Sequence, residues 1–150
     1  MDFTNCYSYA INGQIDPNTG DMLWMNPGYS NKNIIPRNKI RKGEIEAYIL
    51  TDAENYGFGF IDCNTVDRPP TGAYRVALFT DPGNDYHWYR QNPDGTWSHK
   101  MSRFAVTDLD ASNKYIQDPL AADRDYRSFL GGTNYTEFVG YYFVFPLSYV

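Results

Sequence analysis

Helical spacing in the first third of the chain gives way to strand-like alternation in the rest. Residues 39–57 carry apolar side chains three or four positions apart, the spacing of one helix face: Ile45, Tyr48, Ile49 and Ala53. Shorter helices are predicted over 3–13 and over 121–132. Residues 14–38 are rich in Gly, Pro, Asn and Asp, so we expect a long loop there.

Apolar and polar residues alternate, or apolar residues run together, between clear turn sequences in the second half. This pattern predicts strands over 73–80, in the hairpin 85–100, and over 103–108, 114–119 and 136–147. Helices followed by mainly strands indicate an α+β fold, with an N-terminal helix packed on an antiparallel sheet. A chain of 150 residues suits a single domain, 1–150, with its own core.

Both histidines of the chain lie in the predicted hairpin 85–100, on either side of the sequence NPDG. NPDG predicts a type I turn followed by Gly95 at positive φ, which makes a three-residue loop. The resulting register places Tyr89 opposite His99. Because side chains alternate along a strand, His87 and His99 then share one face as diagonal neighbours.

Three interpretations of this pair follow. The two imidazoles can be partly exposed on a solvated sheet face with no special role. They can bind a metal ion such as Zn²⁺, with Asp85, Asp108 or Asp110 as a third ligand. They can also be an acid/base pair that serves a nucleophile elsewhere in the chain.

Cys6 is the candidate nucleophile, because it lies at the start of the first predicted helix, with Thr4 or Asn5 as N-cap. The unpaired N–H groups of a helix N-terminus favour a thiolate and can lower a cysteine pKa to about 3.5–7.5. The same groups, with Asn5 as a further donor, can hold an oxyanion. The alternative is that Cys6 is a small buried side chain, and Cys63 is expected to be a core or loop thiol.

The stretches NCYSYA and HWYRQNPDGTWSH resemble the papain-like cysteine hydrolases, in particular their NlpC-type and CHAP-type branch. In those families the nucleophilic cysteine opens a helix packed on an antiparallel sheet. The base histidine begins a strand, and a polar residue on the next strand orients it. The resemblance implies Cys6 as nucleophile, His87 as base, His99 as orienting residue and Asn5 as oxyanion donor.

The chain departs from the NlpC-type pattern after the cysteine, where Tyr7-Ser8 replaces Ser-Gly. A second assignment takes His99 as the base, with Asp108 or Asp110 orienting it. These departures also allow the alternative that the chain has the papain-like fold but has lost the hydrolase activity.

The leading functional prediction is a thiol hydrolase that cleaves an amide bond in a peptide-like substrate through an acyl-thiol intermediate. A cell-wall (peptidoglycan) peptide is suggested by family analogy alone. One alternative is a non-enzymatic binding or structural module of the same fold, such as a phage particle component, with a protein partner. The other is a metal-dependent hydrolase that uses His87 and His99. No cofactor is expected.

Charge and composition exclude other classes. The 13 Lys and Arg are scattered among 18 Asp and Glu, and the net charge of −5 argues against nucleic-acid binding. No apolar run reaches the roughly 18 residues of a membrane span. The start of the chain lacks the pattern of a secretory signal, which predicts cytoplasmic synthesis and then retention, packaging into a particle or release by lysis. Two cysteines are too few for a disulfide scaffold, although the sequence allows a single Cys6–Cys63 disulfide bond.

Overall fold

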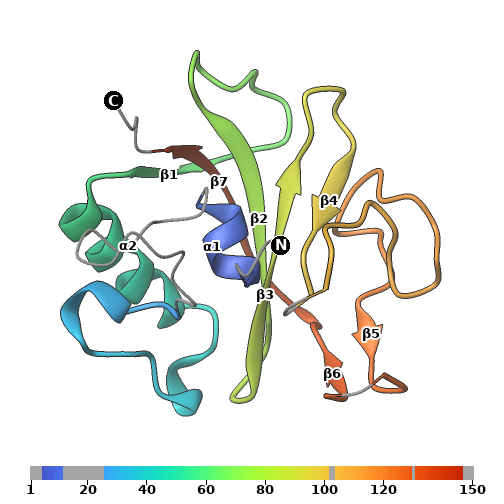
Figure 1. The fold of residues 1–150 in the computed structure, drawn as a ribbon, viewed down its shortest axis with the longest axis horizontal. Coiled ribbons are helices and arrows are strands. Elements are labelled where there is room, and N and C mark those ends of the chain that lie inside the picture. Colours follow the sequence, from blue (N-terminus) through green and yellow to red (C-terminus); the bar gives the residue numbers. More distant parts are fainter. Residues whose placement is uncertain (1–4, 12–25, 102–103, 130, 147–150) are drawn as a thin grey trace.

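An antiparallel sheet forms the centre of the protein in the computed structural model, which describes residues 5–11, 26–101, 104–129 and 131–146 (Figure 1). Five strands pair in the spatial order β1-β7-β2-β3-β4. Their bounds are β1 Gly59–Cys63, β2 Tyr74–Asp81, β3 Asp85–Gln91, β4 Trp97–His99 and β7 Glu137–Phe145. A second, two-stranded sheet pairs β5 (Asp125–Tyr126) with β6 (Thr133–Asn134).

Short helices precede the strands. α1 covers Cys6–Ala10 and α2 covers Ile45–Tyr56, while single 3₁₀ turns lie at Tyr29–Asn31 and Arg37–Lys39. The side-chain oxygen of Asn5 accepts the backbone N–H of Ser8 at 2.9 Å, so Asn5, one of the two N-caps that the sequence predicted, caps α1.

Both faces of the large sheet are covered, and strand alternation divides the core into two clusters. On the helical side, side chains of α1, its C-cap and α2 pack on side chains of the sheet. This cluster contains Tyr7, Ile11, Ile45, Ile49, Val76, Leu78 and Trp88. On the other side, the segments 104–129 and 131–135 cover the sheet with loops and the β5–β6 pair (Figure 1). The second cluster contains Ala77, Phe79, Tyr89, Trp97, Ile116, Tyr126 and Tyr135.

The predicted α+β, papain-like fold class is therefore wrong. The described chain is mainly antiparallel sheet with few helices, and α1 has only five residues. Loops and a small second sheet, rather than helices, cover one whole face. The helical spacing at 39–57 is real, because α2 lies inside it, but it does not represent the architecture as a whole.

The predicted helix over 121–132 is also wrong, because side chains there bond to the backbone in competition with a helix. Asp123 accepts the N–H of Asp125 at 2.9 Å, and Asp125 accepts the N–H of Arg127 at 3.1 Å. The guanidinium of Arg124 donates to the carbonyls of Pro119 and Tyr135 at 2.5 and 2.8 Å. These bonds hold an irregular loop around β5.

The strands predicted over 103–108 and 114–119 are reduced to isolated bridges among the described residues: Thr107 with His99, and Leu109 with Tyr115. The carboxylate of Asp110 accepts the N–H groups of Ser112, Lys114 and Asp123, and these bonds fold the segment into a compact turn. Conversely, the sequence pattern missed β1, which pairs with the distant strand β7.

One buried carboxylate anchors part of the predicted loop 14–38, whose first part, to residue 25, lies outside the described residues. Asp52 of α2 accepts the N–H groups of Gly28 and Ser30 at 2.9 and 3.1 Å, and the Ser30 hydroxyl at 2.6 Å. The hydroxyl of Tyr7 in α1 donates to the same carboxylate at 2.7 Å. Asp52 thus ties α1, α2 and the segment after residue 26 together.

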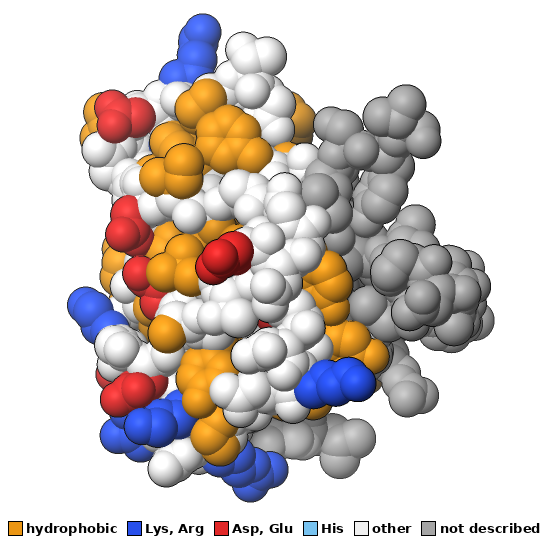
Figure 2. All heavy atoms as spheres, turned by 90° about the vertical axis from the view of Figure 1, so that its left-hand side faces the viewer, with side chains coloured by type: hydrophobic (Ala, Val, Ile, Leu, Met, Phe, Trp, Pro, Cys, Tyr) orange, Lys and Arg blue, Asp and Glu red, His pale blue; other side chains and the backbone are white. Residues whose placement is uncertain are grey.

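The outer surface mixes charge types. Figure 2 shows acidic, basic and apolar side chains interspersed on the side that carries α2, with no histidine visible on this face. Among the described residues, no helix combines the length and the hydropathy needed to cross a membrane.

Candidate functional site

The hairpin that carries both histidines has the predicted geometry. Gly95 has φ of +91°, the N–H of Asn92 donates to the carbonyl of Thr96 at 2.7 Å, and β3 and β4 pair Tyr89 with His99. Because this register places both imidazoles on one face, His87 Nε2 lies 2.7 Å from His99 Nδ1. The predicted proximity of the two histidines is confirmed.

A backbone carbonyl fixes the protons on both rings. Nε2 of His99 lies 2.8 Å from the carbonyl oxygen of Leu109, and a carbonyl only accepts, so His99 Nε2 carries a proton. In the neutral ring, Nδ1 of His99 is then an acceptor, and His87 Nε2–H donates to it. Nδ1 of His87 is left as the acceptor nitrogen of the pair.

Both rings are buried among aromatic side chains, and this environment disfavours their charged forms. His87 and His99 are 2% and 1% exposed, so the interpretation as partly exposed imidazoles is wrong. Tyr135 stacks on His87, and Tyr89 stacks on His99, with ring centroids 5.0 and 4.9 Å apart. Burial lowers the pKa of His87 well below its ordinary value, and the neighbouring His99 lowers it further; burial also lowers the pKa of His99.

Cys6 occupies the first position of α1 and shares a cavity of about 350 Å³ with His87. Asn5, Asp85 and Tyr135 also line this cavity. Within the described residues, no hydrogen bond joins the Cys6 sulfur to either imidazole; the two rings bond to each other and to the Leu109 carbonyl. The predicted site residues are therefore near one another, but without the expected thiol–imidazole bond.

The thiol of Cys6 is not activated. Burial, together with the Asp85 carboxylate, raises the pKa of Cys6 to about 12, although backbone groups of Trp88 in β3 and of Tyr7 and Cys6 at the helix start act in the opposite direction. The predicted lowering by the helix N-terminus is thus outweighed, because a five-residue helix offers little dipole against loss of solvent. The side-chain oxygen of Asn5 is engaged in capping this helix.

Asp85 and Tyr135 complete the polar lining of the cavity. The hydroxyl of Tyr135 donates to Asp85 at 2.9 Å, and burial raises the pKa of Asp85. The sequence indicated Asp85 only as a metal ligand and gave no signal for Tyr135 or for the Leu109 carbonyl. Tyr135 and Leu109 lie in the irregular part of the chain between β4 and β7, whose path depends on tertiary contacts.

The metal interpretation has no geometric support in the described part of the chain, where no group of three His, Cys, Asp or Glu side chains could hold an ion. Asp110 is bound to three backbone N–H groups instead. Cys6 and Cys63 are both free thiols and pack against opposite faces of the sheet, which explains why they form no bridge.

Comparison with known proteins gives one informative match. No family model and no solved structure matches the chain. The chain is 34% identical over 143 residues to insoluble matrix shell protein 1 of Ruditapes philippinarum, covering 95% of this chain and 80% of the relative. The chain belongs to the family of insoluble matrix shell protein 1.

Membership of the insoluble matrix shell protein 1 family overturns the prediction of a thiol hydrolase, because the relative is named as an insoluble matrix protein of the shell. The alternative prediction of a metal-dependent hydrolase is overturned on the same ground. The chemistry of the site agrees with this correction: burial raises the pKa of Cys6 and lowers the pKa of both imidazoles, which bond to each other and to the Leu109 carbonyl.

Proposed function

We propose that this protein is a non-catalytic structural component of an insoluble extracellular matrix, of the kind that gives its relative its name. The observation that carries the proposal is the 34% identity over almost the whole chain. In this proposal the protein acts outside the cell, whereas the sequence predicted cytoplasmic synthesis followed by retention, packaging into a particle or release by lysis.

The hydrogen bonds of the histidine pair support a structural role. The His87–His99–Leu109 chain of hydrogen bonds joins β3, β4 and the covering loop in a buried clamp. Buried hydrogen bonds of this kind favour one arrangement of the elements they join. The imidazole pair is then part of the scaffold rather than of a reaction centre.

We also expect contact with a protein partner in the matrix. Three apolar side chains are strongly exposed: Val66 at 87%, Phe104 at 71% and Tyr115 at 69%. Exposed apolar side chains favour association when they meet a complementary surface.

The proposal is tested by locating the native protein with an antibody raised against the full chain. Extracellular matrix from the producing organism is extracted with salt, then detergent, then a chaotrope, and each fraction and the residue are probed. We expect the protein in the residue that resists salt and detergent. Recovery from the cell extract or from the first salt wash would overturn the proposal.

A further inference from the structure

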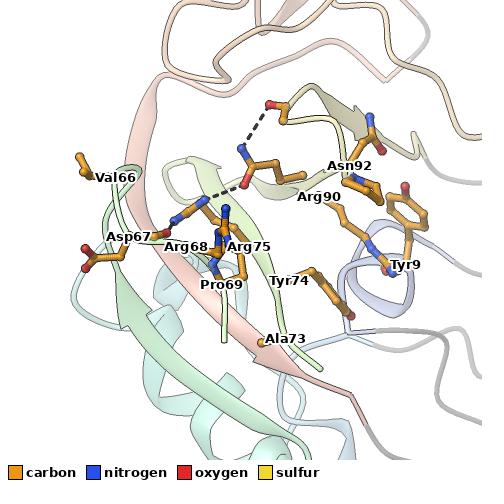
Figure 3. A pocket seen from close by; sticks show the side chains of 13 residues that line it. Tyr9, Val66, Asp67, Arg68, Pro69, Ala73, Tyr74, Arg75, Arg90 and Asn92 are labelled. Atoms are coloured by element: carbon orange, nitrogen blue, oxygen red, sulfur yellow. Dashed lines mark hydrogen bonds between the residues drawn. The ribbon is translucent and has the colours of Figure 1, made fainter. Parts of the chain in front are cut away.

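A second cavity, of about 750 Å³, lies away from the histidines, between the strand ends and α1 (Figure 3). Its charged lining consists of three arginines, Arg68, Arg75 and Arg90, and one acidic residue, Asp67. Three positive charges against one negative charge make it a basic basin in a chain whose net charge is −5. In Figure 3 the Asp67 carboxylate points away from the guanidinium groups.

Arg75 supplies a fixed charge beneath the basin. It is 3% exposed, and its guanidinium donates to the carbonyls of Asn64 and Asp67 and to Gln91 Oε1. All three acceptors are neutral, so they orient the guanidinium without cancelling its charge. A buried cation held in this way is a lasting source of positive potential.

Arg90 is held by two tyrosines. Its guanidinium carbon lies 3.9 Å from the ring centroid of Tyr74 and 5.5 Å from that of Tyr9. The hydroxyl of Tyr74 donates to the carbonyl of Ala10 at 2.7 Å, and that of Tyr9 is bonded to Ser98 Oγ at 2.7 Å. Both tyrosine rings therefore contact Arg90, and both hydroxyls are hydrogen-bonded within the protein. This leaves neither ring available to stack on a sugar.

Arg68 is the accessible cation of the basin. It is exposed, and in the described part of the chain no carboxylate lies within ion-pair distance of it. An arginine fork without a partner matches the geometry of a carboxylate, which it binds through two parallel hydrogen bonds.

We propose that the Arg68–Arg75–Arg90 basin binds carboxylate side chains of an acidic polypeptide. The guanidinium groups supply the charge, and the engaged tyrosine rings favour a peptide carboxylate over a stacked saccharide. This inference goes beyond the structural role and stands without it, because its test needs only the purified protein and synthetic ligands.

The test measures binding of a fluorescein-labelled hexa-aspartate peptide to the full chain by anisotropy, with a hexa-asparagine peptide as control. We expect saturable binding of hexa-aspartate alone, weakening as salt rises from 50 to 200 mM, because exposed charges are screened. R68Q should weaken binding about fivefold, in line with loss of one charged contact. R127Q is the matched control, since it also removes an exposed arginine charge, far from the basin in the Arg127–Asp125 pair, and should leave binding unchanged.

Three results would overturn the proposal. Hexa-aspartate that binds no better than hexa-asparagine removes the carboxylate specificity. Equal losses in R68Q and R127Q show attraction by net charge instead of binding in the basin. A sulfated oligosaccharide that competes more strongly than hexa-aspartate, with the same sensitivity to R68Q, assigns the basin to a glycan. Circular dichroism of each variant checks that the fold is retained.

Discussion

At the scale of single residues, the two histidines illustrate how burial determines the role of a reactive side chain. The same imidazole pair that suggests acid/base chemistry in the sequence lies in an aromatic enclosure, with one ring bonded to the other and the second bonded to a carbonyl. Burial disfavours the charged form of both rings, and their hydrogen bonds join β3, β4 and the covering loop.

This environment makes stability depend on pH. Burial lowers the pKa of both histidines in the folded protein, and unfolding returns each to about 6.5. Below about pH 6.5 the unfolded chain therefore binds more protons than the folded one, and the free energy of unfolding decreases as pH falls. The loss is at most about 1.4 kcal/mol per pH unit for each histidine, until the folded pKa is reached.

Urea denaturation at pH 7, 6 and 5 measures this loss, and the double variant His87→Gln, His99→Gln is the comparison. The wild-type free energy of unfolding should fall with pH, and the variant should lack most of this slope. Asp85, whose pKa is raised by burial, acts in the opposite direction above about pH 3.9 in both proteins. Imidazole NMR shifts that titrate near pH 6.5 in the folded wild type would contradict the account, even if the variant does not fold.

At the scale of elements, local signals predicted the structure where neighbours in sequence are also neighbours in space. The hairpin is the clear case, because NPDG fixes the loop and the loop fixes the register of Tyr89 and His99. The helix over 121–132 failed because Asp123, Asp125 and Arg124 bond to nearby backbone groups. No local pattern reveals β1, which depends on β7 about eighty residues later.

The turn glycine provides a test at this scale. Gly95 has φ of +91°, and a Cβ atom added there would meet nothing within 4 Å, so only backbone conformation opposes a substitution. Gly95→Ala should lower the free energy of unfolding by about 1 kcal/mol. Gly95→Asn should lower it less, because Asn tolerates the left-handed region better. Equal stability of wild type and Gly95→Ala in urea denaturation would show that the turn does not constrain the hairpin.

The Asp52 anchor between α1, α2 and the segment after residue 26 gives a second test. Asp52→Ala leaves the N–H of Gly28 and the hydroxyl of Tyr7 without this acceptor in a buried place. We expect a loss of about 3 kcal/mol in the free energy of unfolding, from unsatisfied polar groups.

The control is Thr51→Ala, one position away on the exposed side of α2, where the hydroxyl bonds only within its own helix. Its effect should stay within about 0.5 kcal/mol. If the two variants are equally stable to urea, Asp52 does not hold these elements together.

At the scale of the whole molecule, the sequence indicated an antiparallel sheet but not the way its two faces are covered. The positions of Cys6 and His87 beside one cavity could be expected from a helix start and a hairpin face. Their chemistry could not, because the raised pKa of Cys6 depends on burial by segments far apart in the chain. Family membership and the chemistry of the site both argue against the predicted thiol hydrolase.

The reactivity of Cys6 tests this central claim most directly. In a Cys63→Ser variant, the rate of alkylation by iodoacetamide is measured from pH 6 to pH 10, in the folded protein and in urea. Because burial raises the pKa of Cys6 to about 12, the folded protein should react far more slowly than the unfolded chain, with no plateau below pH 9. Rapid alkylation at pH 6 that disappears in His87→Ala would reveal a thiolate–imidazolium pair and contradict a structural role.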